Sequence, residues 1–196
     1  MTSAPAVIVF DLEWTAWEGS RAANWSRPGE HREIVQIGAV RLDPALNEVG
    51  AIDLIVRPTL NPVLSDYFIA LTGLTQARVD RSGSTFGRTL DELLDFVGAQ
   101  PAVVYCNGSD NTVLAENCRI NGIDIPTAMN GFRSIRPWLR DAFGVTDERI
   151  DSYKIPLLIG AIRVTTGHDA LHDARCIADG MRHARHRLGI PLPHER

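Results

Sequence analysis

The chain has 196 residues, of which 44% are hydrophobic and 22% are charged, and its formal net charge at pH 7 is −4. This length suits one domain with a well-buried core, and no apolar stretch is long enough to span a membrane. The first apolar stretch has no basic segment before it and runs straight into Asp11, so we expect no cleaved signal peptide. The negative charge excludes a broadly basic surface but leaves room for a local basic path.

The cysteines indicate a reducing environment. Cys106, Cys118 and Cys176 are odd in number and form no Cys-x-x-Cys pair, so neither a zinc site nor a disulfide framework is predicted. We expect buried free thiols in a cytoplasmic protein. Without repeats or low-complexity segments, residues 1–196 are expected to form a single domain whose core runs from about 6 to 188.

Four short apolar segments predict strands. Residues 6–11 form a continuous β-branched run, which is typical of a strand buried on both faces. Residues 34–42 and 52–56 are strand-like and joined by turn residues, so we expect three neighbouring antiparallel strands. Residues 102–106 are the fourth apolar segment. Residues 14–32, rich in Trp, Gly, Ser and charge, predict a loop that is long enough to be functional or mobile.

Helical spacing of apolar residues and capping residues predict four helices. They cover residues 84–98, 109–122, 134–143 and 168–188, with Pro137 in the first turn of the third. Strands come first along the chain, and helices then alternate with further strands. This order predicts a mixed α/β sheet.

Four acids and one histidine lie at the ends of these elements. Asp11 and Glu13 are two apart at the end of a strand, so both point to the same face. Asp110 follows the fourth apolar segment and begins a helix. Asp173 lies about one and a half turns into the last helix, and His168 is expected at or before the cap of that helix.

This set of side chains suits metal-dependent phosphodiester cleavage. The reaction needs a nucleophile near neutral pH and relief of charge in the transition state, and two divalent ions roughly 4 Å apart can provide both. Oxygen ligands favour Mg²⁺ or Mn²⁺ over zinc. A neutral histidine can take the proton of the attacking water. Because crowded carboxylates repel one another, we expect the metal-free site to titrate abnormally.

Taken in order, these residues resemble the motifs of the DEDDh group of 3′→5′ exonucleases, which share a ribonuclease H-like fold. The three motifs are Asp11-x-Glu13, Gly108-x-Asp110 and His168-x-x-x-x-Asp173. The resemblance extends from about residue 6 to 182, and residues 33–40 look like the second strand of that group. Residues 61–68 and 71–75 are most similar to the branch that contains histone-mRNA and small-RNA 3′-end exonucleases and the KinA-pathway inhibitors.

The resemblance implies a mixed five-stranded sheet flanked by helices and two bound Mg²⁺ or Mn²⁺ ions. It implies that Asp11 bridges both ions and that Glu13 and Asp173 complete the ligands of the first. Asp110 would support the second ion, and His168 would be the general base. All five are therefore predicted catalytic residues.

The resemblance also implies a substrate-binding set, made of Leu12, Trp14, Leu74 and Asn111; for Leu74, packing alone is the competing interpretation. Two positions depart from the group, which usually has a smaller residue than Trp14 after its glutamate and, in this branch, often a tryptophan at Asn107. These departures concern the pocket for the terminal nucleotide and leave the metal site intact.

Two further groups of residues leave alternatives open. Trp14, Trp17 and Trp25 lie in or beside the long loop, where they either stack on unpaired bases or anchor the loop on the core. The basic end of the last helix, with Arg182 and Arg185, is better explained by the helix dipole than by phosphate binding.

The sequence thus predicts a metal-dependent 3′→5′ exonuclease that releases nucleoside 5′-monophosphates from a single-stranded 3′ end, with RNA favoured by the branch resemblance. One alternative is a DNA trimming or proofreading exonuclease. Another is a non-catalytic nucleic-acid-binding or assembly module on the same fold. The expected partner is the 3′ end of single-stranded RNA or DNA without any membrane partner, and a homodimer remains compatible with the sequence.

Overall fold

A five-stranded mixed sheet forms the centre of the protein in the computed structural model, which describes residues 5–99, 102–161 and 168–195. The strand order is β3-β2-β1-β4-β5. β1, β2 and β3 are antiparallel neighbours, whereas β4 runs parallel to β1 and β5 runs parallel to β4. The strands are β1 (Ala6–Trp14), β2 (Ile34–Leu42), β3 (Glu48–Ile55), β4 (Ala102–Cys106) and β5 (Phe132–Ser134).

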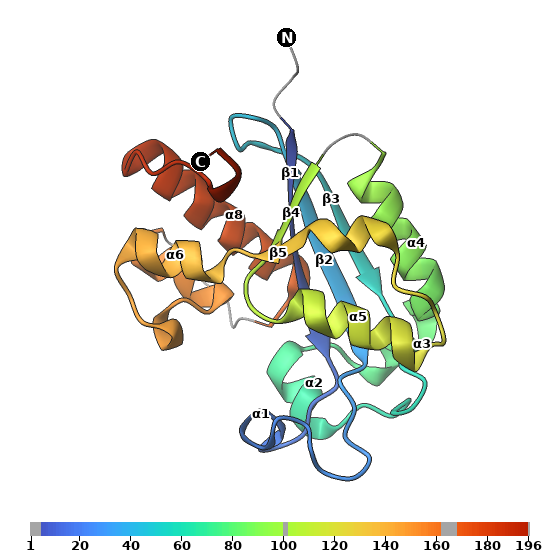
Figure 1. Ribbon diagram of the computed structural model, residues 1–196. Helices are drawn as coiled ribbons and strands as arrows, with labels where there is room; N and C mark the ends of the chain where they lie inside the picture. Colours follow the sequence, from blue (N-terminus) through green and yellow to red (C-terminus); the bar gives the residue numbers. More distant parts are fainter. Residues whose placement is uncertain (1–4, 100–101, 162–167, 196) are drawn as a thin grey trace.

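Helices cover both faces of this sheet (Figure 1). The α-helices are α1 (Ser20–Ala23), α2 (Asp66–Thr72), α3 (Gln76–Ser82), α4 (Phe86–Val97), α5 (Asp110–Ile120), α6 (Arg136–Phe143), α7 (Ile155–Leu158) and α8 (Ala170–Arg187). The 3₁₀ turns are η1 (Thr127–Gly131), η2 (Asp147–Arg149), η3 (Ser152–Lys154) and η4 (Pro193–Glu195). Among these described helices, none combines the length and the apolar character that crossing a bilayer requires.

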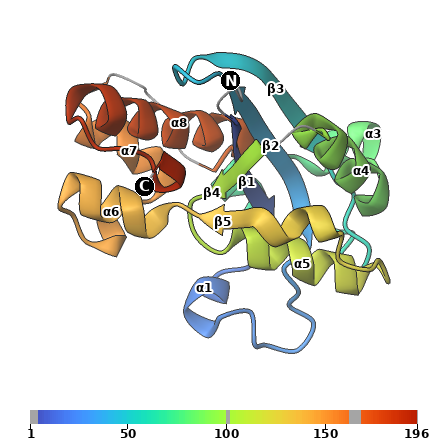
Figure 2. The same cartoon turned by 45° about the horizontal axis from the view of Figure 1, so that its top comes forward.

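The continuous apolar run of β1 is explained by burial on two sides. Ile8 and Phe10 pack into a core shared with α4 and α5, whereas Val7 and Val9 pack into a second core shared with α6, α7 and α8. Figure 2 shows these two groups of helices on opposite sides of the sheet. Because side chains alternate along a strand, Asp11 continues the face of Val7 and Val9. The first acid of the predicted site therefore faces α8.

Most predicted elements are confirmed, with two strands longer than expected. β2 and β4 have the predicted bounds, but β1 continues to Trp14 and β3 begins at Glu48. β1 extends because its backbone stays paired with β2 as far as the pair Trp14↔Ile34, whatever the polarity of its side chains. The predicted loop over residues 14–32 therefore contains the last residue of β1 and the short helix α1.

The four predicted helices appear as α4, α5, α6 and α8, with ends shifted by a few residues. α4 is capped as predicted, because the Thr85 side chain accepts the N–H of Arg88. Ser109 occupies the N-cap position of α5 but makes no capping hydrogen bond through its side chain. The three cysteines are buried, as expected, and none of them is joined in a disulfide.

The first turn of α8 lies directly on the backbone of β2. A Cβ atom added to Gly38 would lie 2.0 Å from the backbone nitrogen of Leu171, so only glycine permits this approach. Two residues away, the Gln36 side chain accepts the N–H of Ala170 at 3.0 Å. Gly38 pairs with Asp11 across the β1–β2 ladder, and this contact therefore brings α8 close to the end of β1.

Gly38→Ala should strongly destabilise the fold, because the added methyl group meets backbone atoms that cannot rotate away. Overpacking of this kind costs about 1–3 kcal/mol or more, and each kcal/mol lowers the melting temperature of a domain of this size by about 2–4 °C. Calorimetry measures the change. Gly50→Ala on β3 is the matched control, because its nearest new contact would be at 3.6 Å. Equal melting temperatures for the two variants would contradict the packing of α8 on β2.

Candidate active site

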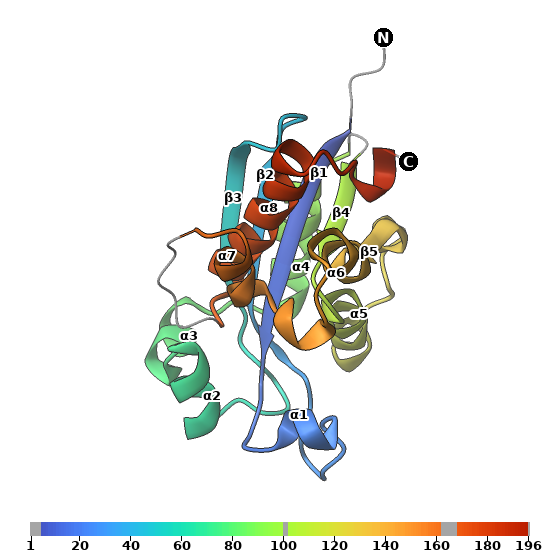
Figure 3. The same cartoon turned by 90° about the vertical axis from the view of Figure 1, so that its left-hand side faces the viewer.

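A cavity of about 480 Å³ lies at the end of the sheet where β1 finishes. Figure 3 shows β1 running toward α1 at this end of the molecule. All five predicted catalytic residues line this one cavity: Asp11, Glu13, Asp110, His168 and Asp173. They come from β1, from the start of α5, and from the start of α8 with the residues just before it. The structure therefore brings together side chains that are far apart in the sequence.

Asp11 and Glu13 project from the same face of β1, as their spacing predicted. Each is only 7% exposed, because α8 covers this face of the strand. The register between β1 and β2 shifts between Glu13 and Trp14, so the regular pairing ends directly after the second acid. Bulges of this kind re-aim side chains at the ends of strands.

The side chain of Asp110 is fixed to β1 by a hydrogen bond from the backbone of that strand. β4 pairs with β1 only as far as Val9↔Tyr105. Farther along β1, the N–H of Leu12 donates to Asp110 Oδ1 at 3.1 Å. Since α5 begins at Asp110, this bond attaches the start of the helix to the strand between the other two acids.

His168 and Asp173 are held together by the backbone before α8. His168 has a φ of +62°, a left-handed conformation that is uncommon outside glycine and concentrated at functional sites. Its N–H donates to Asp173 Oδ2 at 3.2 Å. The imidazole Nδ1 lies 3.8 Å from Glu13 Oε2, and its ring is 5.6 Å from that of Tyr153. The side chain remains 32% exposed, so water can reach it.

The carboxylates fit a hard divalent cation. Asp11, Glu13 and Asp173 each offer one oxygen, and these three oxygens all lie within 4.8 Å of one another. Asp173 Oδ1 is buried and accepts no hydrogen bond from the described residues. An orphaned buried oxygen beside two other carboxylates is explained by a ligand that brings positive charge, and oxygen donors suit Mg²⁺ or Mn²⁺.

Burial gives the metal-free site an abnormal titration, as its crowding predicted. Desolvation, reinforced by the neighbouring acids, raises the pKa of Asp11 and of Glu13 above their ordinary values. The same loss of hydration raises the pKa of Asp110 and of Asp173 to about 7. The neighbouring carboxylate of Glu13 raises the pKa of His168. The site thus holds protons at neutral pH that a bound cation would displace.

Two of the four predicted substrate-binding residues line the cavity, and the other two do not. Leu12 and Trp14 line the cavity. Leu74 does not line it and is 1% exposed, packed in a small core with Phe68 and other apolar residues. Asn111 also lies outside the lining, and its side-chain amide donates to a backbone carbonyl of β5 at 3.5 Å. A direct substrate contact for Leu74 and Asn111 stays a prediction.

The three tryptophans in or beside the long loop lie next to the cavity. Trp25 anchors the loop, because its Nε1–H donates to the backbone carbonyl of Thr15 at 2.9 Å and its ring lies 6.0 Å from that of Trp14. Trp17 and Trp25 both line the cavity. The basic end of α8 is occupied by other protein groups: Arg182 donates to the backbone carbonyl of Leu46, and Arg185 pairs with the carboxylate of Glu195.

Several cavity residues escaped the sequence analysis. Ser152 donates to Asp11 Oδ1 at 3.2 Å, and Asn107, noted only as a departure from the group, donates to Ser152 Oγ. Other residues that line the cavity include Arg21, Tyr67, Leu71, Arg136, Asp151 and Tyr153. Tyr67 lies in the segment 61–68 that carried the branch resemblance, which was the one available signal. Ser152 lies in a short 3₁₀ turn that has no periodic pattern to reveal it.

Asp110→Asn should stabilise the metal-free protein near neutral pH. Because folding raises the pKa of Asp110 from 3.8 to about 7, the folded state binds more protons than the unfolded state between these values. The metal-free protein should therefore lose stability as the pH rises from about 4 to about 7. Asparagine removes the charge and keeps the acceptor for the N–H of Leu12, and each unit of pKa shift avoided is worth about 1.4 kcal/mol.

Thermal unfolding in EDTA at pH 7.5 and pH 5 measures this effect. The melting temperature of Asp110→Asn should exceed that of the wild type at pH 7.5, and the difference should shrink at pH 5. Asp43→Asn is the control, because hydrogen bonds from Asn47 lower the pKa of Asp43 and its replacement should not stabilise the protein. A lower melting temperature for Asp110→Asn at pH 7.5 would show that repulsion and desolvation do not dominate at this site.

Comparisons with known proteins agree with this geometry. Human 3′-5′ exoribonuclease 1 is 34% identical over 92 residues, which cover 46% of this chain and 24% of the human protein. The chain thus spans about a quarter of the length of that curated relative. A structure of 3′-end-specific recognition of the histone mRNA stem-loop by a 3′-exonuclease matches with a TM-score of 0.83 at 22% identity, covering 98% of this chain and 86% of that one.

The nuclease domain of 3′hExo, a DEDDh family member bound to rAMP, matches with a TM-score of 0.81 at 23% identity, covering 97% of each chain. These structural matches show a shared fold, which is the ribonuclease H-like mixed sheet expected from the sequence. The sequence model of the RNase_T exonuclease family matches residues 8–180. Because this match covers nearly the whole chain, the protein belongs to that exonuclease family.

Proposed function

We propose that this chain is a 3′→5′ exonuclease that removes nucleoside 5′-monophosphates from the 3′ end of single-stranded RNA. The observation that carries the proposal is the convergence of Asp11, Glu13 and Asp173, whose ligand oxygens lie within 4.8 Å of one another in a cavity that also holds Asp110 and His168. Membership of the exonuclease family supports phosphodiester hydrolysis as the reaction. The relatives named as 3′-5′ exoribonucleases support the direction and the substrate class.

Two Mg²⁺ or Mn²⁺ ions are the cofactors in this proposal. Asp11, Glu13 and Asp173 would hold the first ion, and Asp11 with Asp110 would hold the second. When bound, the ions supply an activated water and neutralise the charge of the pentavalent phosphate.

His168 acts as the general base in this proposal. Its backbone is fixed by the carboxylate of Asp173, and its ring packs against that of Tyr153. Because Nδ1 faces Glu13, Nε2 is the atom that accepts the proton of the attacking water. The partly exposed side chain then passes this proton to solvent.

The cavity mouth suits an unpaired 3′ end. The cavity volume of about 480 Å³ lies within the range of about 300–1,000 Å³ that is usual for pockets holding one small ligand, so it accommodates a terminal nucleotide and not a duplex. Trp17 and Tyr67 line it and offer aromatic faces on which bases stack. Arg21, whose side chain is 82% exposed, places a cation beside these rings, where a backbone phosphate would lie.

The protein is also proposed to work in the cytoplasm. Its three cysteines are buried and not joined in disulfides, and cysteines of this kind are usual in a reducing compartment.

Removing a metal ligand should abolish cleavage. Asp11→Asn and Asp173→Asn should each lower the rate at least about 100-fold, because a developing charge loses its stabilisation, and EDTA should abolish the wild-type activity. The assay follows 5′-labelled single-stranded RNA and DNA of the same sequence with Mn²⁺. Asp91→Asn, at an exposed position on α4, is the control and should keep the wild-type rate.

The products of this assay separate the alternatives. A ladder that shortens from the 3′ end, with nucleoside 5′-monophosphates released and RNA preferred, supports the proposal. Faster digestion of the DNA would replace the RNA substrate with DNA. The absence of any turnover by the wild type with Mn²⁺ would instead support a non-catalytic nucleic-acid-binding module.

Replacement of His168 should change the pH dependence of catalysis. A base must be deprotonated, and the neighbouring Glu13 carboxylate raises the pKa of His168, so the wild-type rate should fall as the pH drops through that raised value. His168→Asn should lower kcat by about 10²- to 10⁴-fold and flatten this pH profile. His31→Asn, at an exposed position, is the control. An unchanged kcat for His168→Asn would exclude it as the base.

A further inference from the structure

Ser152, which lies outside the sheet, contacts the Asp11 carboxylate in the cavity. It begins η3, and it is 8% exposed. Its Oγ lies 3.2 Å from Asp11 Oδ1, although the two residues are 141 positions apart in the sequence. The contact therefore depends on the tertiary structure and not on local geometry.

The direction of this hydrogen bond follows from the partners of Asn107. The Asn107 side-chain nitrogen lies 2.8 Å from the carbonyl oxygen of Ile150 and 3.1 Å from Ser152 Oγ. A carbonyl only accepts, so the amide nitrogen, and not its oxygen, must face both groups. Ser152 Oγ consequently accepts from Asn107. Its single hydrogen is left for Asp11.

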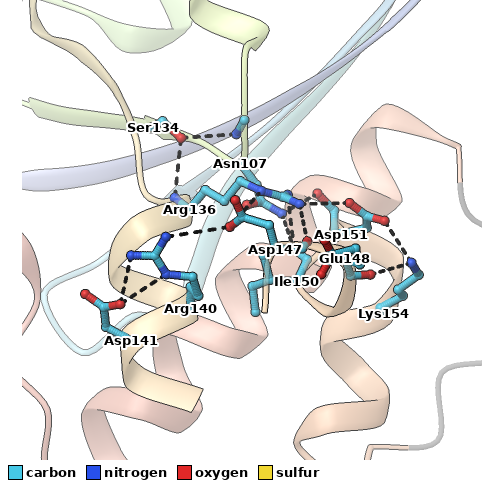
Figure 4. A network of polar contacts seen from close by, with 12 residues as sticks. Asn107, Ser134, Arg136, Arg140, Asp141, Asp147, Glu148, Ile150, Asp151 and Lys154 are labelled. Atoms are coloured by element: carbon cyan, nitrogen blue, oxygen red, sulfur yellow. Dashed lines mark hydrogen bonds and ion pairs between the residues drawn. The ribbon is translucent and has the colours of Figure 1, made fainter. Parts of the chain in front are cut away.

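The segment that carries Ser152 is clamped in place by ion pairs. Arg136, at the start of α6, contacts the Asp151 carboxylate at 3.1 Å and also donates to the backbone carbonyl of Asp147. Lys154 pairs with the other oxygen of Asp151 at 2.9 Å and donates to the backbone carbonyl of Glu148 at 2.7 Å. Figure 4 shows Asp151 between Arg136 and Lys154. The Ser152 hydroxyl therefore approaches Asp11 from a segment that ion pairs hold on both sides.

We propose that Ser152 is a positioning residue that orients the Asp11 carboxylate for a divalent cation, with Asn107 fixing the direction of the serine hydroxyl. The inference rests on the proposed function, because it takes Asp11 as a metal ligand. The hydroxyl donates to Oδ1 of Asp11 and so fixes the plane of the carboxylate. The direction of the other oxygen, Oδ2, is then fixed as well. Groups that hydrogen-bond to metal ligands typically contribute 10- to 100-fold in metal affinity or activity.

Calorimetric titration of the full chain with Mn²⁺, without RNA, tests the inference. Ser152→Ala should raise the dissociation constant for Mn²⁺ by about 10- to 100-fold. Ser152→Thr keeps the hydroxyl and should stay closer to the wild type than Ser152→Ala does. In RNA cleavage at saturating Mn²⁺, Ser152→Ala should lower kcat and leave KM for the RNA largely unchanged.

A double-mutant cycle tests the part assigned to Asn107. Asn107→Ala should weaken Mn²⁺ binding in the wild-type background, because the hydroxyl of Ser152 then loses its fixed direction. The same change should have little further effect in the Ser152→Ala background, since it acts through that hydroxyl. Additive effects of the two changes would overturn the relay from Asn107 to Asp11.

The control and the outcomes separate this inference from the proposed function. Thr89→Val removes another buried hydroxyl, which bonds only within the start of α4, and it should leave Mn²⁺ affinity unchanged. Wild-type affinity in Ser152→Ala would overturn this inference and leave the proposed function standing. Failure of the wild type itself to bind Mn²⁺ would overturn the metal site on which both depend.

Discussion

The burial of four carboxylates in one small volume is the constraint on which the rest of the structure depends. Desolvation and mutual repulsion disfavour such a group, so the fold must hold it together by other contacts. The backbone of β1 fixes Asp11 and Glu13, the N–H of Leu12 holds Asp110, and the contact at Gly38 places α8 with Asp173 beside them. The free energy stored in this arrangement is available for binding a cation, because that ligand relieves both costs.

The first half of β1 packs in the core, and its second half lines the candidate site. Val7 and Val9 pack under α8, and Asp11 and Glu13 follow on the same face where the sheet opens into the cavity. Because alternate side chains of a strand share a face, this face of β1 carries apolar residues first and the two candidate ligands a few residues later. The apolar half of β1 anchors the acidic half, and this explains how charged groups stay buried at the edge of a packed core.

Four of the five strands and the five catalytic candidates were predictable from the sequence because each leaves a local signal, whereas β5 has only three residues and left none. Apolar runs identify β2 and β4, and the acids lie at fixed spacings beside them. The contacts of Ser152 and Asn107 left no such signal, because they join an irregular turn to a strand through tertiary packing. The placement of Leu74 in a small core was equally hidden, since an apolar residue in a helix-linking segment reads the same whether it packs or binds.

Anomalous diffraction from crystals soaked in Mn²⁺ is the most direct measurement of the central claim, which is that these carboxylates form a centre for two divalent cations. We predict a peak coordinated by Asp11, Glu13 and Asp173 and a second between Asp11 and Asp110. Manganese bound elsewhere on the molecule, with these four carboxylates free of metal at saturating concentrations, would contradict the account.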